Sequence, residues 1–266
     1  MAAKVGRWAG FLLAYWRINL LAVLEYRASF LSQVVGMFIN DGIWLAFWAL
    51  FFAKVKLVRG WDSEDIITLW AVVTFGFGLA CALAGNSLRL AGLIMRGQMD
   101  YYLALPKDPL VHVLVSDVNL FGLGDALFGP LVYLLLTPVT WQRTGLFLLA
   151  GLCGAVVFTS VNVLAGSLAF WLGSAETLAR QIFEGMVTFS TYPDAIFSGA
   201  VKVAIYTILP AAIVGPVPAR LLRRFDPHLL ALELGFTALS AAVATVVFRL
   251  GLRHYESGNL LVMRGS

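Results

Sequence analysis

The chain has 266 residues, of which 60% are hydrophobic and only 13% charged, and its mean hydropathy is +0.85. Soluble domains carry about a quarter charged residues, so this chain has too few charges to cover a water-facing surface, and its apolar composition with a net charge of +4 excludes disorder. The composition predicts an all-α membrane protein that crosses the bilayer several times, since each helical span needs about 20 apolar residues.

Residues 1–27 are expected to form a cytoplasmic amphipathic helix at the membrane interface, because arginines interrupt their apolar and tryptophan-containing pattern. A transmembrane domain then extends over residues 28–252. Its first span, 28–53, must include Asp41, because the apolar residues that follow Asp41 are too few to cross by themselves. The second span is expected at 66–85.

The longest polar stretch, residues 86–116, separates the second span from a third span at 117–137. Within it, residues 93–105 mix apolar and charged side chains, which predicts a short cytoplasmic amphipathic helix that docks onto a soluble partner. The residues expected to make this contact are Leu93, Ile94, Arg96, Asp100, Tyr101, Tyr102 and Leu105. The alternative is an interfacial helix that binds no partner.

Residues 173–228 leave the position of the fifth span open. Their first half, 177–197, is moderately apolar but carries Arg180 and Glu184, and their second half is broken by prolines, which interrupt helices. One true span with a re-entrant or interfacial hairpin gives six spans and both termini on one side, whereas two true spans give seven. The fourth and last spans are expected at 146–172 and 229–250, followed by a tail at 253–266.

The distribution of basic residues favours a cytoplasmic N-terminus, which places 11 of the 19 lysines and arginines inside. They form no basic stripe of the kind that binds nucleic acid. No lysine follows a glycine, so the chain has no ATP-binding P-loop, and its histidines form no metal-binding pair. The sequence therefore argues against an enzyme and predicts neither catalytic residues nor a metal site.

Charged residues inside the spans mark the expected substrate pathway, because a carboxylate in the bilayer costs free energy and usually faces the interior of the bundle or a water-filled cavity. Asp41 is the first candidate, followed by Asp125 and, if its segment is the fifth span, Glu184. Trp44 and Trp48 share a helix face and are expected to flank an aromatic cleft. The alternatives are carboxylates paired with another helix and tryptophans packed in the core or against lipid.

Three strings resemble the type-2 ABC exporter permeases, and more narrowly an uncharacterised six-helix permease family that pairs with a separate ATPase. They are Gly-Gln-Met-Asp-Tyr-Tyr-Leu-Ala-Leu-Pro at 97–106, Phe-Ser-Thr-Tyr-Pro at 189–193 and Tyr-Glu-Ser-Gly-Asn at 255–259. The similarity covers nearly the whole chain. It implies a fifth span at 177–197, an external re-entrant hairpin at 198–222, and residues 93–105 as the coupling helix in an ATPase groove.

The same resemblance implies two permease subunits, identical or related, that work with ABC ATPase subunits holding the ATP and Mg; no cofactor is expected in this chain. It implies the cytoplasmic membrane of a bacterium or archaeon, both termini in the cytoplasm, and export of hydrophobic or amphiphilic compounds, some of them cationic, as in multidrug efflux. The alternative from another class is a stand-alone transporter or channel driven by an ion gradient, which predicts more intramembrane charge and inverted repeats.

Overall fold

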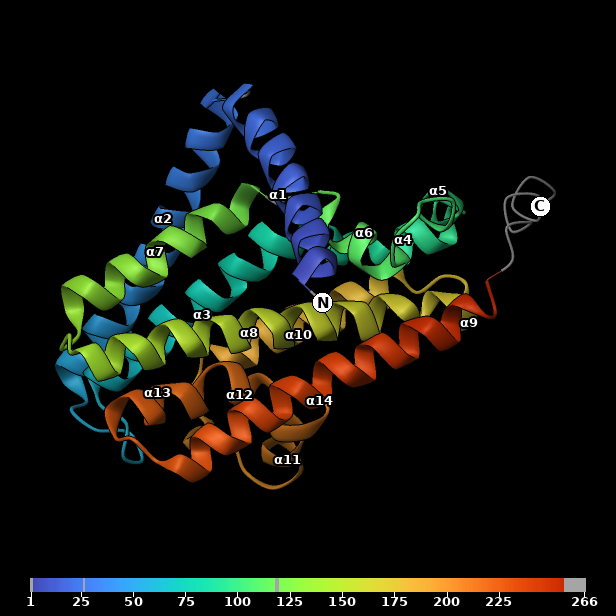
Figure 1. Cartoon of the computed structure of the whole chain (residues 1–266). Helices are drawn as coiled ribbons and strands as arrows, with labels where there is room; N and C mark the ends of the chain where they lie inside the picture. The colour runs from blue at the N-terminus through green and yellow to red at the C-terminus, as the bar shows by residue number, and fades with distance from the viewer. Residues whose placement is uncertain (1, 26, 118–119, 256–266) are drawn as a thin grey trace.

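Helices make up nearly all of the regular structure. The computed structural model describes residues 2–25, 27–117 and 120–255, and in these ranges extended segments pair only at one isolated bridge, between Val58 and Trp61. The helices (Figure 1) are α1 (Ala2–Glu25), α2 (Arg27–Lys54), α3 (Ser63–Ala84), α4 (Leu90–Met95), α5 (Met99–Leu103), α6 (Pro109–Val115), α7 (Leu120–Leu136), α8 (Trp141–Ser167), α9 (Ala169–Leu172), α10 (Glu176–Ser190), α11 (Gly199–Thr207), α12 (Ala211–Val214), α13 (Pro216–Arg223) and α14 (Pro227–Leu252).

Within the described residues, four helical segments are long and apolar enough to cross a membrane: Arg27–Lys54, Ser63–Met95, Trp141–Leu172 and Pro227–Leu252. The pair formed by α11 and the α12–α13 segment passes the same test together, but it bends by 64° at its break. α7 is shorter, and α10 has only 15 residues with several polar ones among them. The prediction of an all-α membrane protein is confirmed, and the number of six spans stays a prediction.

The centre of the bundle is formed by α3 and α8. Of a span-length window in each helix, 78% is buried in the α3 segment and 67% in the α8 segment, against 6% in α2 and 17% in α14. Figure 1 shows α7 lying along α3 with α2 beside it, while α10 and α14 pack against α8. Much of the surface of α2 and α14 is therefore left for lipid or another subunit.

Glycines allow α7 to approach α3 closely. A Cβ atom added at Gly78 of α3 would fall on the backbone nitrogen of Ala126 in α7, far inside contact distance, and one added at Gly129 of α7 would lie 2.5 Å from the carbonyl oxygen of Ala71. Small residues permit such backbone contact between membrane helices. This contact fixes the height of Asp125 on α7 relative to α3.

The long helices run between two ends of the bundle (Figure 1). At the α4–α6 end lie residues 85–116, α9 and the last turn of α14, and the Tyr15 hydroxyl of α1 contacts His112 Nδ1 there at 3.2 Å. At the opposite end, the α13 end, lie the start of α3, the connector between α7 and α8, α13 and the start of α14. Successive helices α2, α3, α7, α8 and α10 therefore run in alternating directions.

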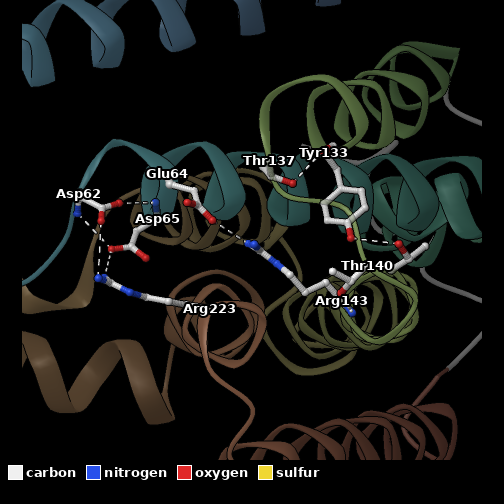
Figure 2. A network of polar contacts seen from close by, with 9 residues as sticks. Asp62, Glu64, Asp65, Tyr133, Thr137, Thr140, Arg143 and Arg223 are labelled. Carbon is white, nitrogen blue, oxygen red and sulfur yellow. Dashed lines mark hydrogen bonds and ion pairs between the residues drawn. The ribbon is translucent and has the colours of Figure 1, made fainter.

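Polar contacts tie the helices together at the α13 end. Figure 2 shows Arg223 of α13 paired with Asp62 at 3.5 Å and with Asp65. Asp62 also caps α3, because its side chain accepts a hydrogen bond from the Asp65 backbone nitrogen at 3.0 Å. Arg143 of α8 reaches Glu64 at 3.0 Å. Carboxylates at the start of α3 thus balance arginines from two other helices.

The chain between α10 and α14 begins and ends at the α13 end. Arg59 donates a hydrogen bond to the carbonyl of Ala195 at 2.9 Å, and Arg223 donates one to the carbonyl of Gly60 at 3.2 Å. Between these points, α12 is fully buried against α10 and α8. This path is that of a hairpin which enters the bundle and returns; the predicted boundaries of the fifth span and of the hairpin at 198–222 stay predictions.

Candidate functional site

A cavity of about 270 Å³ lies among four helices in the middle part of the bundle. α2, α3, α7 and the C-terminal part of α10 each contribute to its wall. Its lining includes the predicted pathway residues Asp41, Trp44 and Asp125, together with Asn40, Trp70, Thr74, Thr188, Thr191 and Tyr192. The last two belong to one of the three strings on which the family resemblance rests, so that string forms part of the cavity wall.

Asp41 and Asp125, predicted separately, lie together in this cavity. They are 3% and 2% exposed, and their carboxyl groups lie within hydrogen-bonding reach of each other. Asn40 Nδ2 donates to Asp41 Oδ1 at 3.2 Å, whereas Asp41 Oδ2 and Asp125 Oδ1 have no hydrogen-bond partner in the described part of the chain. Neither of these two oxygens receives an N–H or O–H group from another residue of the described chain, so the carboxyl pair retains the capacity to accept hydrogen bonds.

Two tryptophans form an aromatic side of the cavity. The rings of Trp44 and Trp70 stack with centroids 6.0 Å apart and planes 23° apart. Sequence reasoning missed Trp70, which no pattern set apart from the other apolar residues of α3. Trp48 does not line the cavity, contrary to the expected cleft: it is buried and packs against Tyr192 with ring centroids 5.8 Å apart.

Glu184 is not part of the same site. It lines a separate cavity of about 550 Å³ between α10 and the α4–α8 side of the bundle. Its side chain is 64% exposed and faces Arg180 at 3.9 Å. The structure therefore separates Glu184 from the Asp41–Asp125 pair, because it lies further towards the α4–α6 end of α10.

Glu233 of α14 is a buried carboxylate that sequence reasoning missed. It is 1% exposed, and neither carboxyl oxygen has a hydrogen-bond partner among the described residues. Its signal was present in the sequence, as the lone acidic residue within the last apolar stretch. No group of three or more His, Cys, Asp and Glu side chains in the described ranges could hold a metal ion.

The segment predicted as a coupling helix is not one helix. α4 ends at Met95 and α5 begins at Met99, and Gly97 between them has φ +71°, a conformation that residues with a side chain rarely adopt. Leu93, Ile94 and Tyr102 are buried in the subunit's own core and Leu105 is half-buried there. The exposed side chains are Arg96, Gln98, Asp100, Tyr101, Ala104 and, missed by the sequence reasoning, Leu103.

Contacts connect this segment to the long helices. Arg96 faces Glu176 at the start of α10 at 3.9 Å, and Asp108 at the start of α6 pairs with Arg249 of α14 at 3.0 Å. Burial, together with the neighbouring Asp100 carboxylate, raises the pKa of Tyr255 to about 12. Tyr255 starts the third family string, so that string meets the first one here; residues 256–266 of the predicted tail lie outside the described residues.

His112 gives the α4–α6 end an expected pH dependence. Burial and the nearby Lys107 hold the pKa of His112 below its usual value. The folded chain therefore disfavours the protonated form of His112. The free energy of unfolding is highest above the ordinary histidine pKa of about 6.5, and it falls as the pH drops below that value, because the unfolded chain then binds the proton more readily. The unfolding temperature of His112→Gln should fall less between about pH 8 and about pH 5.5 than that of the wild type. His228→Gln, at an exposed histidine, should behave like the wild type; an unchanged slope in His112→Gln would contradict this role.

A family model described as ABC-2 family transporter protein matches residues 38–258. The match includes the cavity-lining residues named above, helices α4 to α6 and the whole of α14. No curated protein and no solved structure matches the chain in the corresponding comparisons. Permeases of this family generally work with ABC ATPase partners. The chain belongs to the ABC-2 transporter family and is a multi-pass membrane permease of an ABC transporter.

Proposed function

We propose that this permease belongs to an ATP-driven exporter of hydrophobic or amphiphilic compounds, cationic ones included. ABC ATPase subunits, which carry the ATP and Mg, bind at the α4–α6 end, and a second permease subunit, identical or related, completes the pathway. The protein resides in the cytoplasmic membrane of a bacterium or archaeon with both termini in the cytoplasm. The family membership supports the permease role; the direction of transport and the substrate are part of the proposal.

The observation that carries the proposal is the exposed surface of α5 at the α4–α6 end. Tyr101 is 65% exposed and Leu103 is 45% exposed, and the charged side chains of Arg96 and Asp100 lie beside them in the chain. A few apolar anchors with charges around them are typical of a helix that docks into a groove of a partner. The buried residues of the same segment share a core cluster with residues of α8 and α14. A force that the ATPase applies to α5 is therefore transmitted to these long helices.

The polar face of α10 supports a pathway shared with another subunit. Arg180, Gln181, Glu184 and Thr188 are exposed, although α10 extends from the α4–α6 end to the cavity in the middle part of the bundle. Polar side chains at membrane depth need protein or water around them. A second permease facing α10 across a water-filled pathway meets this need.

The test uses the permease co-purified with its ATPase and reconstituted into proteoliposomes. We expect ATP-dependent accumulation of a fluorescent amphiphile on one side of the membrane, stimulation of the ATPase by that compound, and no ATP hydrolysis by the permease alone. Transport by the permease alone, driven by an imposed ion gradient and independent of the ATPase, would instead establish the stand-alone transporter and reject the proposal.

A further inference from the structure

We propose that the cavity between α2, α3, α7 and α10 binds the ammonium group of a protonated amine that carries an apolar or aromatic body. The inference rests on the proposed function, because it names the substrate class of the pathway. It depends on three features of the same cavity: the paired carboxyl groups of Asp41 and Asp125, their unpartnered oxygens, and the stacked rings of Trp44 and Trp70.

The charge of the carboxyl pair matches a single positive charge. Two carboxyl groups within hydrogen-bonding reach can share one proton, as such pairs do in other proteins. The Asp41–Asp125 pair then carries one negative charge on two buried carboxyl groups. A monovalent cation neutralises it, and a low dielectric strengthens this attraction relative to water.

The unpartnered oxygens favour a cation that carries N–H groups. Asp41 Oδ2 and Asp125 Oδ1 are both buried and both lack a donor in the described part of the chain. An alkylammonium group donates up to three hydrogen bonds from one small head group. Each carboxyl oxygen has two lone pairs, so these oxygens can accept N–H groups from the ligand while the pair keeps its shared proton.

The aromatic rings favour an organic cation over an inorganic one. An ammonium group near the face of a tryptophan is attracted by the negative charge density of the ring. Trp44 and Trp70 also present apolar surface. This surface stabilises the apolar body of an amphiphile, whereas it does not stabilise the binding of a hydrated metal ion. Trp44 and Thr188 are exposed, so the ligand can enter between α2 and α10.

The size of the cavity indicates a head-group site. Its volume of about 270 Å³ falls just below the range of about 300–1,000 Å³ usual for drug-sized ligands. The ammonium group and part of the adjoining apolar body fit inside. The rest of an amphiphile extends outward along α2 and α10.

Binding of naphthylethylamine to the full-length chain in nanodiscs tests the proposal, with naphthylethanol as the neutral analogue of similar shape. Equilibrium dialysis against empty nanodiscs separates specific binding from partitioning into lipid. The double variant Asp41→Asn/Asp125→Asn should weaken amine binding by at least about tenfold and leave binding of the alcohol unchanged. Glu233→Gln is the matched control, because it removes another buried carboxyl group that does not line this cavity.

A second variant covers the case in which the double variant does not fold. Trp44 is 40% exposed, so Trp44→Ala is expected to fold, and it should weaken binding of the amine more than binding of the alcohol. Unchanged amine binding in either variant, equal losses for amine and alcohol, or an equal loss in Glu233→Gln would overturn the proposal. So would displacement of the amine by millimolar sodium, potassium or magnesium, because the site would then be one for inorganic cations.

The assay needs neither ATP nor an ATPase, so it distinguishes a failure of this site from a failure of the proposed function. Amine binding without ATP-driven transport would reject the exporter and keep the site. ATP-driven transport of neutral amphiphiles without amine binding would keep the exporter and reject the site.

Discussion

Replacement of Gly78 by alanine is expected to destabilise the permease by about 1–3 kcal/mol or more, the usual range for overpacking an interior. The added methyl group would fall on the backbone nitrogen of Ala126. Backbone cannot rotate away as a flexible side chain can, so α3 and α7 must separate. Asp125 lies next to Ala126 in α7, so a shift of α7 should disturb the carboxyl pair and the cavity as well. The measurement is the unfolding temperature of the purified subunit in detergent, followed by size-exclusion chromatography after heating.

Gly235→Ala provides the matched control for this prediction. Gly235 lies in α14, and a Cβ atom added there meets nothing within 4 Å. Alanine is the better helix former by about 1 kcal/mol, so this variant should be as stable as the wild type or slightly more stable. If Gly78→Ala and Gly235→Ala unfold at the same temperature, the result contradicts the conclusion that α3 and α7 are in backbone contact at Gly78.

The double variant Tyr101→Asp/Leu103→Asp is expected to lose the ATPase while the permease itself remains folded. Both side chains are largely exposed, so their replacement removes little from the core of the subunit. If both are buried on docking, each contributes about 1.5–3 kcal/mol, and their loss should weaken association by roughly a hundredfold or more. Co-purification of a tagged ATPase with the permease, followed by ATP-dependent transport, measures the effect.

The control for the docking variant makes the same change at the other end of the bundle. Val55 and Leu57, in the connector between α2 and α3, are 40% and 59% exposed. Val55→Asp/Leu57→Asp should leave ATPase association intact, because this connector lies at the α13 end. Loss of the ATPase in the control, or its retention in Tyr101→Asp/Leu103→Asp, would show that α5 is not the docking surface. Leu105, half-buried in the subunit's own core, is unsuited to this test.

Composition and residue order were enough to establish the class of the protein and to single out Asp41 as a charge within a membrane span. Apolar composition and segment length required membrane helices, because unpaired backbone groups are too costly in lipid for other structures. The apolar residues that follow Asp41 are too few to cross the membrane by themselves, so the first span has to contain Asp41. This argument needed no structure. The absence of a glycine–lysine phosphate loop similarly followed from the order of residues alone.

Which of the predicted pathway residues lie in one cavity could not be read from the sequence and follows from the packing of the helices. Asp41 and Asp125 lie 84 positions apart in the chain, and their meeting depends on how α7 packs against α3 and α2. Helical periodicity places a side chain on a face, but it does not say which neighbouring helix that face meets. Trp44 and Trp48, on one predicted face, accordingly ended in different surroundings: one lines the cavity and the other is in the core.

The α4–α6 end shows the same limit on a smaller scale. Mixed apolar and charged residues at 93–105 indicated a segment with one face for a partner, but several apolar residues instead pack into the subunit's own core. Gly97 divides the segment into α4 and α5 through its backbone conformation. In α5, Tyr101 and Leu103 are the large apolar side chains that remain exposed. Burial depends on contacts between segments distant in sequence, so which apolar residues remain free to bind a partner depends on the core cluster that α4 and α5 form with residues of α8 and α14.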